Sequence, residues 1–233
     1  MSAGTADSTQ KRAVVPANPF PRYPLHEILD RNSLPPVPSF QRGNRPRDHL
    51  WASELGSCQR AVWLNWHHPR PHDDEFEQHR GALGHAVEDI IAKKVARMLV
   101  AREVSFNTPK VTGRTDFVLF IDEKQVPLEM KSTYAFSRAM AEPRRSHQLQ
   151  LLWYTQQLDA PFGLLLYYDL SNYAGNSGHW DVLRLPRDDE RVNRRIEHLW
   201  YIVHQNHGGP QCEDEKPDEC WDCSLAAGRA HDE

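Results

Sequence analysis

The run from Phe162 to Asp169 constrains the fold more than any other part of this chain, because it is almost entirely apolar over the length of one strand. An unbroken apolar run of this kind indicates a strand buried on both faces, which requires a layer of structure on each side of its sheet. Helices are the expected layers, since apolar residues recur at helical spacing in several segments. The expected helices are a short one near 53–64 that carries Cys58, and longer ones over 81–100, 146–158 and 188–206, with a loop over 67–80.

Further strands are expected where β-branched and aromatic residues gather between turn signals. These strands are 104–106, 113–121, 125–132 and 179–185, and a turn at 122–124 is short enough to join the second and third as a hairpin. The resulting order is helix, three strands, helix, strand, followed by one more strand and helix. This order predicts an α/β fold in which a mixed sheet is flanked by helices.

Composition divides the chain into three regions. Eight of its 17 prolines lie in the first 48 of 233 residues, where no apolar periodicity is present. We therefore expect residues 1–48 to form a Pro-rich, flexible arm and residues 49–210 to form the folded core. Residues 211–233 are expected to form an acidic segment that contains cysteines.

Charge and hydropathy exclude several classes of protein. The net charge is −4, but residues 213–233 hold eight acidic and two basic side chains, which leaves the preceding residues at +2. A nucleic-acid binder with a uniformly basic surface is excluded, whereas a local basic groove is not. No uncharged apolar run approaches the ~18–20 residues of a membrane span, and the first 16 residues lack the apolar centre of a secretory signal. A cytoplasmic protein without a membrane partner is expected.

Three ionisable residues interrupt the apolar strands of the predicted hairpin. Asp116 lies within one strand, and Glu129 and Lys131 lie two residues apart in the next, so that both point to one face while Leu128 and Met130 point to the other. Burying such groups without a role is costly, whereas two carboxylates can hold Mg²⁺ or Mn²⁺ through oxygen. A neighbouring lysine can then orient a metal-bound water or stabilise charge on an attacked phosphate. A hairpin with these residues on a solvated face is the alternative.

Two helical segments carry further candidates. His85 lies in the helix before the strands, and imidazole is a common metal ligand, although a single helical histidine is more often exposed. Gln150 and Tyr154 are four residues apart, so they share one face of the helix after the hairpin. A surface glutamine next to a core tyrosine is the alternative for this pair.

The order of these residues resembles the PD-(D/E)xK nuclease superfamily in its RecB-like branch. The resemblance covers about residues 85–154, although Thr115-Asp116 lacks the proline that names the superfamily. It implies a restriction-endonuclease-like αβββαβ core and a metal-dependent nuclease that hydrolyses phosphodiester bonds in DNA. The resemblance implies a role for each position: Mg²⁺ or Mn²⁺ binding by His85, Asp116, Glu129 and the Met130 carbonyl, catalysis by Lys131, and support of the active site and of DNA by Gln150 and Tyr154.

The four cysteines all lie outside this core, one before it and three within 12 residues after it. They are Cys58, Cys212, Cys220 and Cys223. A chain without an export signal is not expected to use them as a disulfide framework, and Cys220-x-x-Cys223 is a familiar pair of metal ligands. Zinc and an iron–sulfur cluster both remain open on this pattern. Either group would join the N-terminal helix to the C-terminal segment.

The cysteine arrangement resembles the iron–sulfur subgroup of RecB-like nucleases. That subgroup comprises CRISPR-associated RecB-like exonucleases, their phage-encoded relatives and the AddB-type nuclease domain, and the segment Glu54–Trp63 looks like its first-cysteine helix. The resemblance implies a [4Fe–4S] cluster, with zinc as the alternative, because the C-x7-C-x2-C spacing here departs from the subgroup's C-x2-C followed by a third cysteine. It further implies a prokaryotic or phage-encoded exonuclease on single-stranded DNA or DNA ends. The expected settings and partners are those of CRISPR adaptation, recombination and repair, or phage DNA processing.

Basic residues near the candidate site are expected to contact phosphates. The favoured set flanks the loop that follows Lys131, and consists of Arg138, Arg144 and Arg145. A second arginine set on the last helix shares one face, which is either a solvated face or a further phosphate contact; it consists of Arg187, Arg191, Arg194 and Arg195. Two other functions stay open: a catalytically silent iron–sulfur subunit that binds DNA, and a zinc-stabilised interaction module.

Overall fold

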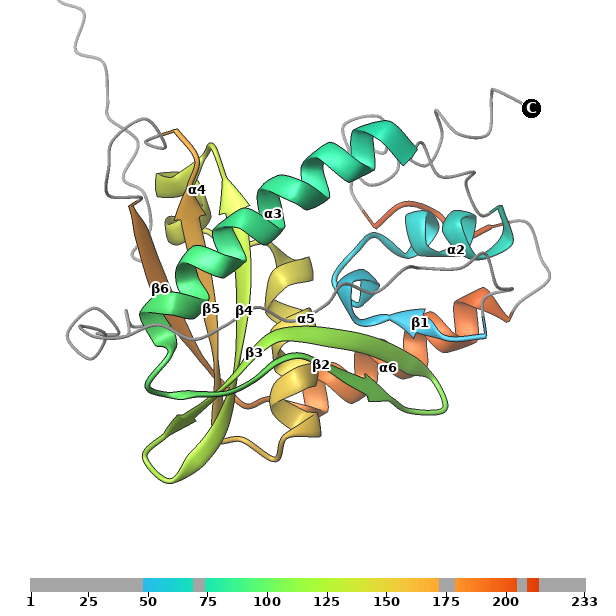
Figure 1. Cartoon of the computed structure of the whole chain (residues 1–233). Coiled ribbons are helices and arrows are strands. Elements are labelled where there is room, and N and C mark those ends of the chain that lie inside the picture. The colour runs from blue at the N-terminus through green and yellow to red at the C-terminus, as the bar shows by residue number, and fades with distance from the viewer. Residues whose placement is uncertain (1–47, 69–73, 172–178, 205–208, 214–233) are drawn as a thin grey trace, which may run out of the picture.

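The structure, a computed structural model, describes residues 48–68, 74–171, 179–204 and 209–213. Figure 1 labels its elements in chain order. They are β1 (Leu50–Trp51), the 3-10 helix η1 (Ala52–Glu54), α2 (Gln59–His67), α3 (Asp74–Val95), β2 (Leu99–Asn107), β3 (Val111–Ile121), β4 (Lys124–Thr133), α4 (Phe136–Ala141), α5 (Arg145–Gln157), β5 (Phe162–Asp169), β6 (Trp180–Pro186) and α6 (Asp189–Val203).

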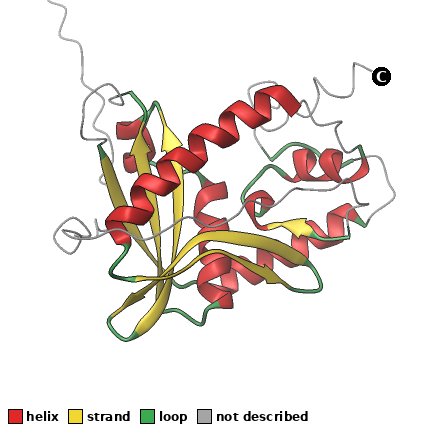
Figure 2. Cartoon of the chain, in the orientation of Figure 1, coloured by secondary structure: helices red, strands yellow, loops and turns green. Residues whose placement is uncertain are grey.

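The described strands form one six-stranded sheet (Figure 2). Their order is β1-β3-β4-β5-β6, and β2 pairs with β3 outside this path. The pairs β1–β3 and β4–β5 are parallel, and the other three pairs are antiparallel. The predicted α/β architecture with a mixed sheet flanked by helices is therefore confirmed, including the order helix, three strands, helix, strand.

Helices cover both faces of this sheet (Figure 1). The core beneath α5 and α6 receives Leu165 and Tyr167 of β5, whereas the core beneath α3 receives Leu164 and Leu166 of the same strand. Successive side chains of a strand point to opposite faces, so a strand between two cores needs apolar residues at every position. All eight residues of β5 are buried, as its sequence predicts.

The pairing between β3 and β4 stops partway along β3. These strands pair as far as Phe117 and Leu128, and farther along the same edge β3 pairs with β1 instead. Asp116 and Glu129 are the first residues beyond the last β3–β4 pair. We call the place where the two strands separate, at Asp116 and Glu129, the β3–β4 fork.

Several predicted boundaries are wrong. The helix predicted over 81–100 is α3, which begins at Asp74 and ends at Val95, so part of the predicted 67–80 loop is helical. Met98 and Leu99 continue the apolar spacing of α3, but the Met98 carbonyl accepts a hydrogen bond from Phe120 of β3 (2.7 Å), and Leu99 begins β2. This strand extends beyond the predicted 104–106. The prediction was too short because most side chains of the strand are only partly buried, so its apolar pattern in the sequence is weak.

Short elements were also missed. The helix predicted near 53–64 is divided into η1 and α2, with Cys58 at the N-cap of α2, and neither β1 nor α4 was predicted. All but the last residue of the predicted arm over 1–48, and most of the 211–233 segment, lie outside the described residues. Among the helices that are described, none combines the length and apolar character needed to span a bilayer.

Candidate functional site

The β3–β4 fork holds two carboxylates beside each other. Asp116 accepts a hydrogen bond at Oδ2 from the backbone N–H of Met130 (2.7 Å), so its carboxylate takes the place of a strand carbonyl at the point where pairing ends. This bond fixes the Asp116 carboxylate against β4, next to Glu129. The fork thus brings together residues that are more than ten positions apart in the chain.

Glu129 and Lys131 lie on one face of β4, as their spacing predicts, while Leu128 and Met130 belong to the core beneath α3. Lys131 Nζ donates to Glu129 Oε1 at 2.7 Å, and Glu129 is only 1 % exposed. The other oxygen, Glu129 Oε2, is buried and has no hydrogen-bond partner among the described residues. A buried carboxylate oxygen without a partner is costly, so this atom indicates a missing electropositive group.

The pKa shifts of the fork residues also indicate a missing positive group. Burial raises the pKa of Asp116 well above its usual range, and the charge of Glu129 raises it further against the opposing effect of Lys131. Burial likewise raises the pKa of Glu129, which Lys131 opposes. Burial lowers the pKa of Lys131, but the nearby carboxylates outweigh it and the net shift is upward. The fork therefore holds more negative than positive charge, and oxygen ligands with this surplus suit a divalent cation.

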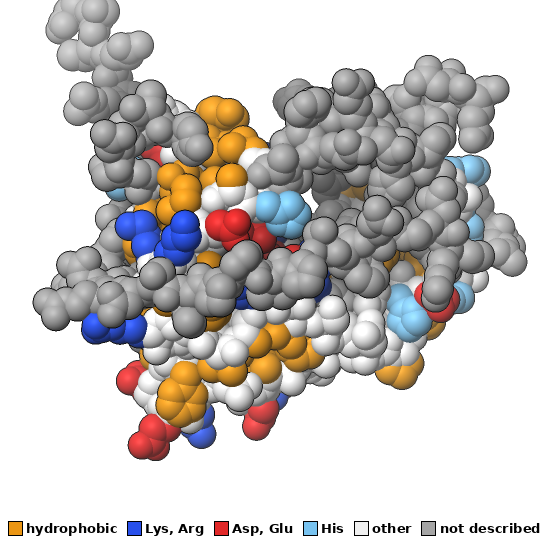
Figure 3. All heavy atoms as spheres, in the orientation of Figure 1, with side chains coloured by type: hydrophobic (Ala, Val, Ile, Leu, Met, Phe, Trp, Pro, Cys, Tyr) orange, Lys and Arg blue, Asp and Glu red, His pale blue; other side chains and the backbone are white. Residues whose placement is uncertain are grey.

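His85 lies on α3, with Glu88 beside it. His85 Nδ1 is 3.3 Å from Glu88 Oε2, and the charge of Glu88 raises the pKa of both Asp116 and Glu129. The possible ligand atoms of His85, Glu88 and Glu103 of β2 all lie within 4.8 Å of one another. Figure 3 shows acidic side chains next to a histidine on this face.

Glu88 and Glu103 are site residues that the sequence interpretation missed. Glu88 could have been found, because it lies three residues after His85 and so shares its helical face. Glu103 gives no such signal: it lies in a strand that the sequence predicted only in part, it has a φ of 52°, and it forms an ion pair with Arg114 (3.1 Å). Its place beside His85 depends on the pairing of β2 with β3.

Gln150 and Tyr154 share one buried face of α5, as predicted. Gln150 Nε2 donates to the Tyr154 hydroxyl (3.2 Å), and that hydroxyl donates to the carbonyl of Arg114 (2.9 Å). Burial and the charge of Glu129 raise the pKa of Tyr154, so the hydroxyl stays protonated and able to donate. The pair thus holds the part of β3 that precedes Asp116.

His147 on α5 is a further buried group that the sequence interpretation missed. Its Nδ1 is hydrogen-bonded to the Tyr167 hydroxyl (2.8 Å), and Tyr167 is the β5 register partner of Lys131. Burial lowers the pKa of His147 to about 3, with smaller contributions from Lys131 and Arg144. A neutral imidazole therefore lies on the α5 side of Lys131. His147 could have been found from the sequence, because it lies three residues before Gln150 and so shares its helical face.

The structure brings together two of the four cysteines. Cys58 Sγ lies 3.6 Å from Cys212 Sγ, much longer than the ~2.05 Å of a disulfide bond. Two thiolates on one tetrahedral ion, with metal–sulfur bonds of ~2.3 Å, lie about 3.8 Å apart. The donor chemistry suits zinc or an iron–sulfur cluster, and this separation matches two thiolates on a single ion. Cys220 and Cys223 lie outside the described residues.

Arg195 of α6 joins the two cysteine-bearing segments. It is 6 % exposed and donates to the carbonyls of Leu55 (2.8 Å) and Ser57 (2.5 Å), which precede Cys58. It also donates to the carboxylate of Glu213 (2.5 Å), the residue after Cys212. One buried guanidinium therefore fixes the chain on both sides of the sulfur pair.

Gly56 explains how the segment before Cys58 reaches this position. A Cβ built there would lie 2.3 Å from the backbone of Ser146 at the start of α5, so only glycine allows the two backbones to approach.

The three arginines predicted to contact DNA lie in α4 and at the start of α5, after the end of β4. Arg138 is on α4, Arg144 is the N-cap of α5, and Arg145, the first residue of α5, donates to Glu213 (3.1 Å).

Comparisons with known proteins place the fold. No known family profile and no curated protein matches the sequence. The solved structure of SSO0001 matches with a TM-score of 0.51 and 18 % identity, covering 87 % of this chain and 90 % of that one. A phage-related exonuclease from Haemophilus somnus 129PT matches with a TM-score of 0.44 and 11 % identity, covering 64 % and 78 % of the two chains. An alkaline exonuclease from Laribacter hongkongensis matches with a TM-score of 0.46 and 10 % identity, covering 67 % and 88 %. The likeness to SSO0001 establishes a shared fold.

Proposed function

We propose that this protein is a metal-dependent deoxyribonuclease that hydrolyses phosphodiester bonds, acting as an exonuclease on single-stranded DNA or DNA ends. The observation that carries the proposal is Glu129 Oε2, a buried carboxylate oxygen without a partner among the described residues, next to Asp116 and Lys131 at the β3–β4 fork. DNA as the substrate and exonuclease action follow from the resemblance to RecB-like nucleases.

Mg²⁺ or Mn²⁺ is the group that fits this fork. Asp116 and Glu129 would hold it with His85 and the carbonyl of Met130, and Glu88, which lies beside His85, would add an oxygen ligand. When bound, the ion supplies Lewis acidity, which lowers the pKa of a water and polarises the phosphate. It would also neutralise the carboxylates, whose pKa values burial raises.

The chain's own residues then have separate tasks. Lys131 orients the attacking water through Nζ and stabilises the negative charge that develops on the phosphate oxygens. Glu129 Oε1 holds this ammonium group in place at 2.7 Å. Gln150 and Tyr154 act on the backbone before Asp116, so they keep the carboxylate at the fork.

The cysteines form a separate centre in this proposal. Cys58 and Cys212, with Cys220 and Cys223, would hold one thiolate-bound group that joins the N-terminal helix to the C-terminal segment. The resemblance favours a [4Fe–4S] cluster, whereas the 3.6 Å between the sulfur atoms of Cys58 and Cys212 matches a single ion such as zinc. Its task is structural, because metal binding supplies folding free energy to a short acidic segment.

The DNA strand would reach the fork past the segment between β4 and α5. Arg138, Arg144 and Arg145 lie in or beside this segment and would contact phosphates. CRISPR adaptation, recombination and repair, or phage DNA processing are the settings that the resemblance favours.

Cleavage of end-labelled single-stranded DNA with Mn²⁺ tests the proposal, with all proteins purified without oxygen. We compare the wild type with Lys131→Ala and with Lys124→Ala, which removes an exposed lysine from the other end of β4. Cleavage should be lost in Lys131→Ala alone, and the product ladder gives the polarity. Equal cleavage by all three proteins would overturn the catalytic assignment. Binding of DNA without cleavage by any of them would identify a catalytically silent subunit.

A further inference from the structure

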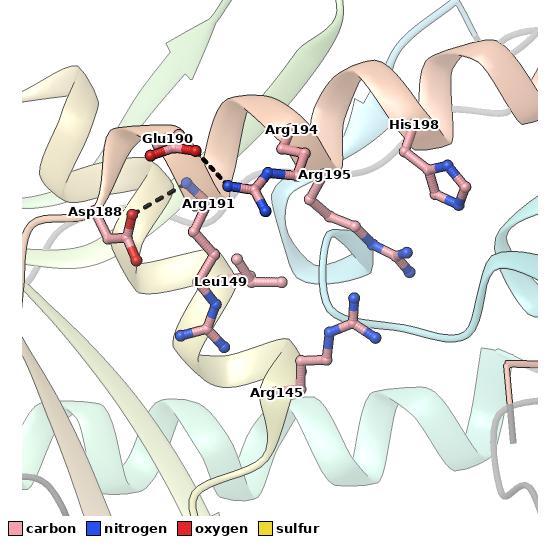
Figure 4. A pocket seen from close by; sticks show the side chains of 8 residues that line it. All are labelled: Arg145, Leu149, Asp188, Glu190, Arg191, Arg194, Arg195 and His198. Carbon is pink, nitrogen blue, oxygen red and sulfur yellow. Dashed lines mark hydrogen bonds and ion pairs between the residues drawn. The ribbon is translucent and has the colours of Figure 1, made fainter.

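A pocket lined mainly by arginines lies between the N-terminal end of α5 and the exposed face of α6 (Figure 4). Its volume is about 580 Å³, within the about 300–1,000 Å³ of pockets that bind small ligands. Leu149 lies in its wall, and Arg145 and Arg195 point toward each other across it. The other basic side chains in its lining are Arg191, Arg194 and His198.

The positive charge of this pocket is only partly neutralised. Arg145 and Arg195 share the single carboxylate of Glu213, so two guanidinium groups meet one negative charge. Arg194 forms an ion pair with Glu190. Arg191 donates to the neutral Gln148 side chain (3.3 Å), and no ion pair of Arg191 is found within the described ranges.

Asp188 also lines the pocket, but it neutralises little of the positive charge because its side chain caps α6. The Asp188 side chain accepts a hydrogen bond from the backbone N–H of Arg191 (3.0 Å), which caps α6. The lining with Glu213 thus holds four arginines and three carboxylates, and the exposed guanidinium of Arg191 is the least neutralised. An anion is the ligand that this lining favours.

The pocket is joined to the fork through the first turn of α5. His147 in this turn is hydrogen-bonded to the hydroxyl of Tyr167 (2.8 Å), and Tyr167 is the β5 register partner of Lys131, so the turn lies beside the strand that carries the lysine. Arg145, the first residue of the same turn, lines the pocket. Gln148 accepts from Arg191 and thereby connects the same turn to α6. The turn thus connects the strand of the proposed catalytic lysine to the pocket.

We propose that this pocket binds phosphates of a single-stranded nucleic acid whose next nucleotides lie at the β3–β4 fork, as a second contact outside the metal site. The inference rests on the proposed nuclease function and adds to it the part of the strand that the enzyme holds. Successive phosphates along one strand need a row of positive groups, which Arg145, Arg191 and Arg194 of the pocket lining supply. Arg195 has a structural role here because it is buried and its donors are already used by Leu55, Ser57 and Glu213.

Binding of fluorescent single-stranded oligonucleotides, measured by anisotropy without added Mg²⁺ or Mn²⁺, tests this inference. Arg191→Gln/Arg194→Gln removes two exposed charges from the pocket, and Lys124→Gln/Arg184→Gln removes two exposed charges from β4 and β6 as a matched control. Each lost phosphate contact lowers the slope of log affinity against log salt by ~0.7, so the pocket variant should lose about 1.4 of slope. If the two proteins bind equally at 1 M salt, the same relation gives about 25-fold weaker binding by the variant at 0.1 M salt.

Three outcomes would overturn the inference. The first is an unchanged affinity and salt slope in the pocket variant, and the second is an equal loss in the control. The third is competition by a mononucleotide as tight as by the oligonucleotide, which would identify a site for a small anion. The test reads binding alone, so its failure is separate from a failure of the Lys131→Ala cleavage test.

Discussion

Cys58 and Cys212 lie 154 positions apart in the chain, yet their sulfur atoms are 3.6 Å from each other. The first residue lies after the two-residue strand β1 and before all the other strands, and the second follows the last described helix, so the contact joins the two ends of the core. A thiolate-bound metal at this place would stabilise the fold by linking these ends, since such binding is coupled to folding. Measuring the metal content of the protein therefore tests whether the two cysteines bind a metal at this place.

Cys58→Ser and Cys212→Ser should each lose the bound metal and lower the midpoint of thermal unfolding. Serine is a poor replacement for a thiolate ligand, whereas Ser57→Ala in the same loop keeps the backbone carbonyl that Arg195 uses and should retain the metal. Elemental analysis of protein purified without oxygen measures the outcome. About four irons per chain would indicate the cluster, and about one zinc would indicate a tetrahedral ion. Neither metal in the wild type would contradict the site.

Arg195→Met should destabilise the protein and weaken metal retention together. The variant keeps the apolar stem of the side chain but leaves the carbonyls of Leu55 and Ser57 without their donor and the Glu213 carboxylate without its buried partner. Removing one partner of a buried hydrogen-bonded ion pair costs about 3–5 kcal/mol, and we expect the low end because Glu213 is partly exposed.

Urea unfolding of Arg195→Met and of Arg194→Met, with metal content measured on both, checks this expectation. Arg194 is the neighbouring exposed arginine and its ion pair with Glu190 lies in solvent, so its loss should change stability by less than about 1 kcal/mol. Equal stability of the two variants would show that Arg195 does not hold the cysteine segments.

The sheet was predictable where burial is unambiguous. β5 is apolar at every position because it lies between two cores, and the predicted bounds 162–169 agree with the structure. β2 lies at the sheet edge with partly buried side chains, so only residues 104–106 near its C-terminal end gave a signal. The predicted end of α3 was wrong because Met98 and Leu99 continue the helical spacing of apolar residues. In the structure the Met98 carbonyl instead bonds to β3, and Leu99 begins β2.

The candidate site was predictable where it depends on local spacing. Glu129 and Lys131 share a face because strands alternate, and Gln150 and Tyr154 share one because helices repeat. Glu103 could not be found in this way, since it approaches His85 only through the pairing of β2 with β3. The contact of Arg195 with Glu213 likewise depends on tertiary packing, which no local pattern encodes.

Glu129→Gln and Lys131→Ala should separate metal binding from turnover. Glu129→Gln removes a charged ligand, so stabilisation by Mn²⁺ in a thermal shift measurement should disappear together with cleavage. Lys131→Ala keeps both carboxylates, so Mn²⁺ should still stabilise the protein while cleavage falls by about 10²–10⁴-fold. Stabilisation of Glu129→Gln by Mn²⁺ equal to that of the wild type would show that the ion binds elsewhere.

His147 predicts a loss of stability in mild acid. Burial, together with Lys131 and Arg144, lowers its pKa to about 3 in the folded protein, whereas an unfolded histidine titrates near 6.5. Between these values the unfolded chain binds the proton and the folded chain does not. The free energy of unfolding attributed to His147 therefore falls as the pH drops below 6.5, by about 2 kcal/mol at pH 5 relative to pH 8.

His147→Gln should remove this part of the pH dependence, because glutamine can still bond to the Tyr167 hydroxyl but does not titrate. The raised pKa values of Asp116 and Glu129 act with the opposite sign, but both carboxyls are present in wild type and variant, so the difference between the two proteins isolates His147. Tyr167→Phe is the control: it removes the hydrogen bond yet leaves the imidazole buried, so its pH dependence should follow the wild type. Urea unfolding of all three proteins at pH 5 and pH 8 measures the effect. A His147→Gln variant that loses as much stability in acid as the wild type would show that the acid sensitivity has another origin.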